Sequence, residues 1–240
     1  RESDYDDYNG KGDSVAEYYK RTKGGNVTYG RVRSEYVKDF ITLESKSTKY
    51  TTYKGGYNYE ENNSKYAFKD MDYIGKNFGR TNSMTWSHVF DNRDNVYDPT
   101  RGKRLAFTGV VAGHGLGGDF SYYKLISELR TYYKVGRSQV VAFRLMGGMG
   151  FGDMPFTDLF SLGGADTLRG YEDDEFRGNR MYEATLEYRF PIVKKVQGVL
   201  FTDAGNAWGG LGNVPWYEEN NKLHWAVGAG VRITTPIGPV

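Results

Sequence analysis

The feature that most constrains the fold of this chain is a strict two-residue alternation over residues 180–190. One set of positions is apolar or aromatic, and it comprises Tyr182, Ala184, Leu186, Tyr188 and Phe190. The other set is mostly charged, and it comprises Glu183, Thr185, Glu187 and Arg189. Successive side chains of a β-strand point to opposite faces, whereas a helix would scatter the two sets around its axis. The segment is therefore predicted to be a strand with one apolar face and one wet face.

The same alternation recurs along the chain and predicts an all-β, antiparallel fold. Further strands are expected over residues 16–31, 36–46, 83–88, 104–111, 139–150, 196–208 and 223–235. Residues 120–135 allow two interpretations, because their apolar positions fit helical spacing as well as strand spacing. Their tyrosines and the short Gly-Arg-Ser turn that follows favour a strand, and we predict one there.

Composition restricts the kind of β-structure. The 240 residues include 32 glycines, 21 tyrosines and 13 phenylalanines but no cysteine, which excludes a disulfide framework and thiolate chemistry. The net charge of +2 is too small to favour capture of nucleic acid. Mean hydropathy is −0.67, and no run reaches the roughly 18–20 apolar residues of a spanning helix. A transmembrane β-barrel has a low mean hydropathy by construction, because lipid-facing and lumen-facing residues alternate.

Short and long connections alternate between the predicted strands. Short turns follow residues 135, 190 and 235, and long loops are expected at 47–80, 153–178 and 209–222. Outer-membrane barrels have short periplasmic turns and longer extracellular loops. The pattern therefore predicts an antiparallel transmembrane β-barrel in which the three long loops share one end.

The alternation also assigns side chains to the two sides of such a barrel wall. Lipid contact is expected for Tyr182, Leu186, Tyr188, Trp225, Val227 and Val231. Lumen positions are expected for Glu183, Glu187, Arg189 and Arg232. A register error of one residue would exchange the two sets.

The loop at 153–178 carries the most distinctive motif. Residues 163–171 read Gly-Gly-Ala-Asp-Thr-Leu-Arg-Gly-Tyr, and an acidic run follows at 172–175. Alternation on the two following strands places Glu187 and Asp203 on the lumen face, where Arg169 of an entering loop could reach both. A guanidinium held in this way forms bidentate hydrogen bonds and locks its loop in place. The alternative is a set of unrelated solvated charges in a wet lumen.

Together these features resemble the BamA-like superfamily of outer-membrane insertases and transporters. The resemblance rests on the paired glycines and loop signature Gly163, Gly164, Leu168, Arg169, Gly170 and Tyr171, on the strand motif Phe201-Thr202-Asp203-Ala204-Gly205, and on the Asp-Pro-Thr-Arg-Gly turn at 98–102. It implies that the loop folds back into the barrel and that Arg169 pairs with Asp203, with Glu187 close by. Gly170 is expected to allow a tight turn at the loop tip. Tyr171 is expected to pack beside Phe201 or the glycines of the wall.

The resemblance also implies the extent of the fold. Residues 1–240 are expected to form one outer-membrane β-barrel domain, as a partial barrel of about eight to ten strands out of roughly sixteen. The soluble N-terminal domains of the family and its last strands are expected to lie outside this sequence.

By the same resemblance, the protein would fold and insert β-barrel proteins into the outer membrane of a Gram-negative-type envelope. Its partners would be unfolded outer-membrane β-barrel substrates, membrane lipid and accessory assembly lipoproteins, with no nucleic acid and no cofactor. A two-partner secretion or translocation-assembly transporter of the same superfamily is an alternative. A passive porin and a soluble tyrosine-rich β-protein are further alternatives.

Enzymatic and ligand-binding functions have little support in the sequence. The three histidines, His88, His114 and His224, are dispersed over different elements, and no catalytic motif accompanies them. Residues 113–118 satisfy G-x-G-x-x-G literally, but no helix follows that would bind a pyrophosphate, so a hairpin loop is expected. The acidic run 172–175 is expected to be a solvated loop face rather than a metal site.

Overall fold

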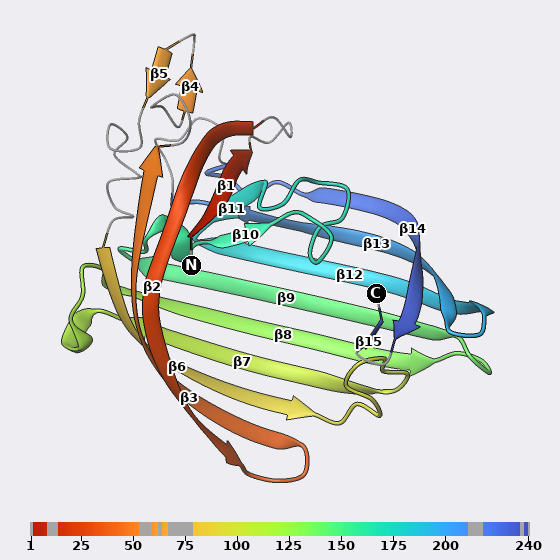
Figure 1. Ribbon diagram of the computed structural model, residues 1–240. Coiled ribbons are helices and arrows are strands. Elements are labelled where there is room, and N and C mark those ends of the chain that lie inside the picture. Colours follow the sequence, from red (N-terminus) through yellow and green to blue (C-terminus); the bar gives the residue numbers. More distant parts are fainter. Residues whose placement is uncertain are drawn as a thin grey trace.

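The computed structural model describes residues 2–8, 14–52, 59–61, 64–66, 79–210, 218–235 and 238–239. Within these residues, thirteen strands form one sheet and two further short strands form a second. Figure 1 shows the long strands of the main sheet running side by side across the molecule. The fold is therefore all-β, as the alternation predicts.

The main sheet contains nine long strands and four shorter ones. The long strands are β2 (Ser14–Val32), β3 (Val37–Thr52), β6 (Gly79–Asp91), β7 (Gly102–Ala112), β8 (Tyr122–Lys134), β9 (Val140–Gly152), β12 (Arg180–Val193), β13 (Val196–Trp208) and β14 (His224–Thr235). The shorter strands are β1 (Glu2–Tyr8), β4 (Tyr59–Glu61), β5 (Ser64–Tyr66) and β15 (Gly238–Pro239). A tilted strand needs about 9–11 residues to cross a membrane, and each long strand meets this length. The nine long strands confirm the predicted number of about eight to ten.

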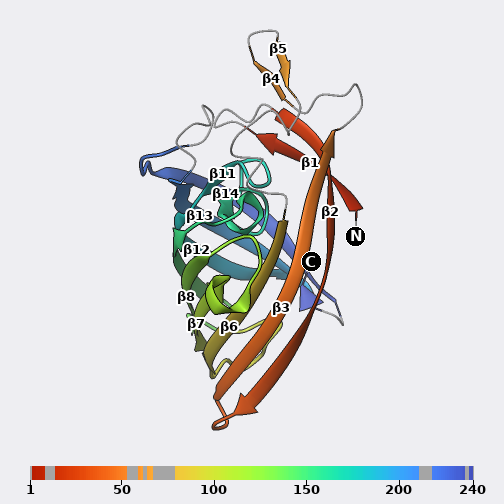
Figure 2. The same ribbon diagram turned by 90° about the vertical axis from the view of Figure 1, so that its left-hand side faces the viewer.

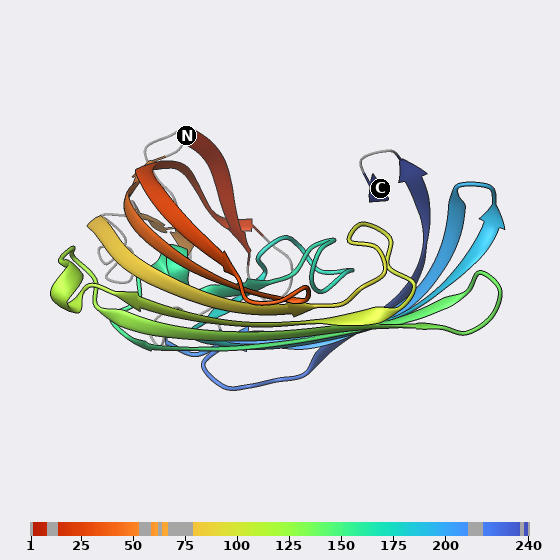
Figure 3. The same ribbon diagram turned by 90° about the horizontal axis from the view of Figure 1, so that it is seen from below.

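The long strands pair in chain order, each antiparallel to the next. β9 pairs directly with β12, so the segment between them is excluded from the path of the main sheet. Figure 3 shows that the sheet curves into a trough, which stays open between β1–β2 and β14–β15 in the described residues. This is the wall of a partial barrel.

The two faces of the wall have the predicted character. Leu186 is 46% exposed on the outer face of β12, while its neighbours on the inner face include Glu183, which is 0% exposed. Trp225, Val227 and Val231 of β14 are also exposed, and Tyr182 lies half-buried against Trp208. The chamber on the inner side is lined by Glu187, Arg189 and Arg232, among others. The predicted register is confirmed.

The connections between strands also lie at the two ends of the sheet as predicted. Antiparallel pairing puts the connections after β3, β7, β9 and β13 at one end of the sheet and those after β6, β8, β12 and β14 at the other. At the second end, Gln197 donates a hydrogen bond of 3.0 Å to Asp98 and joins the β6–β7 turn to the start of β13.

Among the described residues, no helix is long and apolar enough to span a membrane.

Two segments predicted as loops contain more regular structure than expected. The segment 47–80 begins inside β3, which continues to Thr52, and includes β4 and β5; residues 53–58, 62–63 and 67–78 of it lie outside the described part. The polar extension of β3 carries no apolar face, so alternation cannot reveal it. The segment 153–178 contains the 3₁₀ helix η3 (Phe156–Asp158) and the strands β10 (Phe160–Leu162) and β11 (Phe176–Gly178). Three-residue strands are too short for a period-2 pattern.

Other boundaries are close to the predicted ones. Residues 120–135 contain β8, which confirms the strand and excludes the helix. β12 continues through the expected turn at 191–195 as far as Val193, with a register shift after Pro191. The loop predicted at 209–222 is described only in part, because residues 211–217 lie outside the described range.

Candidate functional site: an inward-folded loop and its arginine

The connection between β9 and β12 folds onto the inner face of the sheet. Its strands β10 and β11 form a small antiparallel hairpin with Phe160 opposite Gly178 and Leu162 opposite Phe176. Figure 2 shows this segment on the concave side of the wall, in front of β12 and β13. The loop therefore lies where the lumen of a barrel would be.

Apolar packing fixes the base of the loop. Phe160, Leu162, Leu168 and Phe176 form a buried cluster with Met181 and Ala207 of the wall. Gly148 of β9 makes room for this cluster, because a Cβ atom at that position would overlap the Phe160 ring. Gly150 has a similar role, because a Cβ atom at that position would overlap Met154.

The loop tip is a compact turn built on glycines. Gly163, Gly164 and Gly170 have φ angles of 122°, 88° and 90°, which side chains with a Cβ rarely adopt. The Gly164 amide donates to the Tyr171 carbonyl at 3.0 Å and so closes the tip. Thr167 Oγ1 accepts from the Gly163 amide at 2.9 Å and donates to the Gly163 carbonyl at 2.8 Å. These bonds hold residues 163–171 in one conformation that presents Arg169 to the wall.

Arg169 contacts both carboxylates that the alternation places on the lumen face. Its Nε and Nη2 donate to Asp203 Oδ2 and Oδ1, each at 2.7 Å, and its Nη1 donates to Glu187 Oε1 at 2.8 Å. The Arg169 amide adds a bond of 3.2 Å to Asp203 Oδ2. Asp203 is 0% exposed, so its carboxylate is satisfied by the loop rather than by water. Bidentate, charge-assisted bonds of this kind are among the strongest in proteins.

The aromatic contacts of the signature differ in part from those expected. Phe201 lies under the Arg169 guanidinium, with the Arg169 Cζ atom 3.5 Å from its ring centroid. Tyr171 packs on Phe176 and His224 instead, with ring centroids 5.1 Å and 5.9 Å away, and donates to the Trp225 carbonyl at 3.3 Å. Of the two packing positions expected for Tyr171, the one beside Phe201 is wrong, because the Arg169 guanidinium occupies that ring face. The position beside the glycines of the wall stays a prediction.

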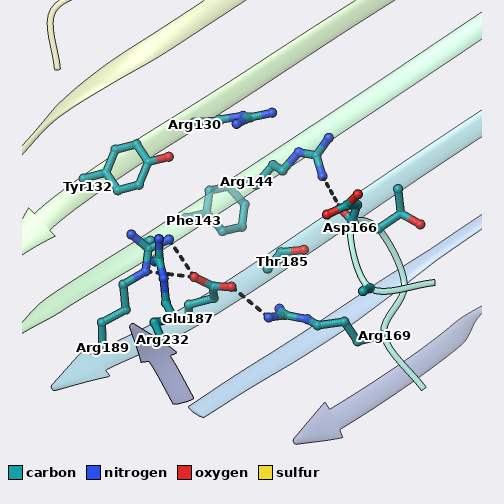
Figure 4. A pocket seen from close by; sticks show the side chains of 13 residues that line it. Arg130, Tyr132, Phe143, Arg144, Asp166, Arg169, Thr185, Glu187, Arg189 and Arg232 are labelled. Carbon is teal, nitrogen blue, oxygen red and sulfur yellow. Dashed lines mark hydrogen bonds and ion pairs between the residues drawn. The ribbon is translucent and has the colours of Figure 1, made fainter. Parts of the chain in front are cut away.

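A chamber of about 410 Å³ lies beside the arginine and is lined in part by Asp166 and Thr167 of the loop tip. Figure 4 shows Glu187 between Arg169 on one side and Arg189 and Arg232 on the other. Arg189 donates to Glu187 Oε2 through Nε at 2.9 Å and through Nη2 at 2.7 Å. Glu187 thus links the loop arginine to an arginine of its own strand.

A second charged network holds the loop backbone, and the sequence did not reveal it. Arg144 of β9 donates to the Asp166 carbonyl at 3.1 Å, to Glu183 at 2.8 Å and to Glu128 at 2.9 Å. Glu128 also accepts from Arg104 and Arg130. Alternation predicted the lumen position of Glu183, but a bond to a loop carbonyl has no sequence signal.

A third contact fixes the start of the loop to the far side of the trough. Asp158 of η3 accepts from the Tyr122 hydroxyl at 2.6 Å and forms an ion pair with Lys46 of β3. Lys124 donates to the Asp158 carbonyl at 2.7 Å and lies over the Phe160 ring. The only sequence signal was one carboxylate within the largely apolar stretch 154–162.

The acidic run 172–175 is only partly exposed to solvent, whereas a fully solvated face was expected. Glu172 and Asp173 are exposed, but Glu175 is buried and accepts from the Glu172 amide at 2.9 Å. Burial raises the pKa of the Glu175 carboxyl above its ordinary value. The expectation of a solvated face is therefore wrong at Glu175, because the residue closes the hairpin between the tip and β11.

The described residues contain no group of three or more metal-ligating side chains that could hold a metal ion. The glycine-rich residues 113–118 form a loop around the three-residue 3₁₀ helix η2 (His114–Leu116). No longer helix follows that could present its N-terminus to a phosphate; β8 begins at Tyr122 instead.

A curved antiparallel wall, apolar outside and charged inside, with a loop locked onto its inner face, defines an outer-membrane β-barrel with an inserted loop. The chain belongs to the Omp85 superfamily, whose domain model matches residues 2–240. It is therefore part of an integral β-barrel protein of an outer membrane.

The chain is also similar to a curated relative and, in fold, to two solved structures. The chain is 27% identical to the outer membrane protein assembly factor BamA of Nitratidesulfovibrio vulgaris over 254 aligned residues, which cover 91% of this chain and 31% of that relative. Its fold is similar to the crystal structure of BamA from Haemophilus ducreyi lacking POTRA domains 1-3, with a TM-score of 0.74 and 20% identity over 98% of this chain and 52% of that one. It is also similar to CdiB from Acinetobacter baumannii, with a TM-score of 0.56 and 15% identity over 95% and 38% of the two chains. The chain thus spans about a third of the length of the curated relative.

Proposed function

We propose that the protein folds other β-barrel proteins and inserts them into the outer membrane, and that this segment supplies part of the barrel wall and its inserted loop. The observation that carries the proposal is the contact of Arg169 with Asp203 and Glu187, which joins the loop to two adjacent strands. The likeness to an assembly factor over 91% of the chain supports the same function.

The proposed mechanism uses strand pairing rather than bond-making chemistry. An open strand edge has unpaired N–H and C=O groups, and an incoming chain can form hydrogen bonds with these groups by adding a strand. Such a template must keep its wall in a fixed register while its edge opens. The loop supplies this rigidity, because Arg169 contacts β12 through Glu187 and β13 through Asp203 at the same time.

The partners follow from this mechanism. The substrates are unfolded outer-membrane β-barrel proteins, whose strands lack partners before insertion. Membrane lipid surrounds the outer face, and accessory assembly lipoproteins are the proposed protein partners. The signature residues Gly163, Gly164, Leu168, Arg169, Gly170 and Tyr171, with Phe201, Asp203 and Glu187 on the wall, are proposed as the positioning site.

The test is an assembly assay with the purified protein in lipid vesicles and an unfolded barrel substrate. Arg169→Ala should slow substrate folding at least about tenfold, because the loop loses its bidentate contact, while the protein itself still inserts. Arg137→Ala is the matched control, since Arg137 is exposed in the turn between β8 and β9. Equal assembly rates for both variants would contradict the proposal.

A transporter of the same superfamily is the second candidate, because the fold is also similar to that of CdiB. That likeness covers less of the neighbour and has the lower TM-score. Export of a cognate passenger through the barrel, without any effect on the folding of unrelated barrel substrates, would favour the transporter.

A further inference from the structure

The outer face of the wall carries a groove of about 710 Å³ between β6 and β13. Its lining includes the outward-facing residues Trp86, Phe107, Leu125 and Met149 of β6 to β9, which are 45–58% exposed. Small-molecule sites in proteins have volumes of roughly 300–1,000 Å³. The groove is therefore large enough for part of a lipid molecule and opens directly to the membrane.

Strand pairing shows how the groove is built. One cross-strand row contains Trp86, Gly109, Leu125, Met149, Arg180 and Trp208, and the next contains Phe107, Ser127, Gly147 and Tyr182. The small residues Gly109, Ser127 and Gly147 form the floor. The aromatic rings stand at the two sides, where Tyr182 and Trp208 meet edge to face with centroids 5.7 Å apart.

The two floor glycines are required neither by backbone conformation nor by packing. Neither has a positive φ angle, and a Cβ atom would come no closer than 3.7 Å to any neighbour at Gly109 or 3.9 Å at Gly147. Glycine inside a strand weakens it and often marks a site where a ligand approaches the backbone closely. Here the consequence of both glycines is an open floor.

One cation stands at the end of the groove. Arg180 is the first residue of β12 and is exposed, at the end of the sheet that carries the long loops. Among the described residues, the Arg180 guanidinium forms no ion pair and no hydrogen bond. A guanidinium at this level matches a phosphate, which it binds through two parallel hydrogen bonds.

We propose that the groove binds one anionic, phosphate-bearing lipid. Its phosphate lies at Arg180, and one acyl chain runs over Gly109, Ser127 and Gly147 toward Phe107. The inference does not depend on the assembly function, since it uses only the membrane location of the wall and the shape and charge of its outer face.

The test is native mass spectrometry of the purified protein in detergent, with added phosphatidylglycerol or with phosphatidylcholine of the same acyl chains. We expect one phosphatidylglycerol to be retained at collision energies that remove phosphatidylcholine. Gly147→Leu, which fills the floor, and Arg180→Gln, which removes the charge, should each weaken this retention about tenfold, and Arg180→Lys should keep part of it. Gly25→Leu is the control, because Gly25 also has open space and lies outside this groove.

Two results would overturn the proposal. The first is equal retention of the two lipids by the unaltered protein, or unchanged retention in both Gly147→Leu and Arg180→Gln. The second is a dimer that Gly147→Leu dissociates while lipid retention stays the same, because a second copy of the chain would then be the occupant.

Discussion

Gly147 and Gly148 are neighbours on β9, yet they serve opposite sides of the wall. On the inner side, a Cβ at Gly148 would overlap the Phe160 ring, so the glycine is a packing requirement of the inserted loop. On the outer side, Gly147 has room for a side chain and leaves a groove open toward the membrane. Glycine thus permits close packing of the loop on the inner face and leaves a groove on the outer face.

The charges of the two faces differ in the same way. On the inner face, Asp203, Glu187 and Glu183 all accept from arginines, and the loop covers them. On the outer face, β12 and β14 present Leu186, Trp225 and Val227 to the membrane. The wall therefore has a polar, tightly bonded side and an apolar side whose partner is lipid.

The largest change in stability is expected where a charged residue replaces an apolar residue on the outer face of the wall. Leu186→Arg places a cation at the middle of β12 and should lower the free energy of unfolding in a bilayer by about 2–4 kcal/mol. Ile192→Arg, near the end of the same strand, should cost about 0–1 kcal/mol, because the charge reaches the interface. Denaturant unfolding in lipid vesicles measures both. Equal costs at the two positions would show that the assigned outer face is wrong.

The glycine pair gives the next test. Gly148→Leu should destabilise the loop by about 1–3 kcal/mol, because the side chain displaces Phe160 from its place in the buried cluster. Gly147→Leu should change stability by less than about 1 kcal/mol, since nothing occupies that space. Protease sensitivity of the loop, combined with denaturant unfolding, separates the two variants. A larger loss for Gly147→Leu would reverse the comparison.

The first of these tests uses a feature that the sequence predicts well, whereas the roles of the two glycines required the structure. Period-2 alternation determines which side chains share a face, so the strands, the register and the lumen positions of Glu187 and Asp203 followed from it. Alternation cannot predict which residues of the wall a loop side chain contacts inside the lumen. For that reason the bond of Asp158 to Tyr122, the bond of Arg144 to the loop backbone and the packing of Tyr171 on His224 required the structure.

The contact between η3 and β8 predicts a smaller effect. Tyr122→Phe removes the hydroxyl that donates to the Asp158 carboxylate and should destabilise the start of the loop by about 1.5 kcal/mol. Tyr123→Phe on the outer face is the matched control and should change stability by less than about 0.5 kcal/mol. Hydrogen exchange in residues 156–162 measures the change. Unaltered exchange in Tyr122→Phe would show that the Tyr122 hydroxyl does not stabilise the start of the loop.

The smallest effect is expected at Glu175. Its folded pKa is raised by burial, so the unfolded chain releases the proton first and loop stability falls as the pH rises through the interval between the two pKa values. Glu175→Gln should therefore stabilise the loop slightly at pH 7 and leave it unchanged at pH 4. Loop protection measured at both pH values checks this. A loss of protection at pH 7 would mean that the ionised carboxylate is required.

The central claim is that Arg169 and Asp203 act as one unit that fixes the loop to the inner wall. A double-mutant cycle of Arg169→Ala and Asp203→Ala, read by hydrogen exchange at the amides of Gly164 and Arg169, tests it most directly. Each single variant should lose most of the protection at these amides, and the double variant should lose little more than either one. Full additivity of the two losses, or protection that survives Arg169→Ala, would contradict the account.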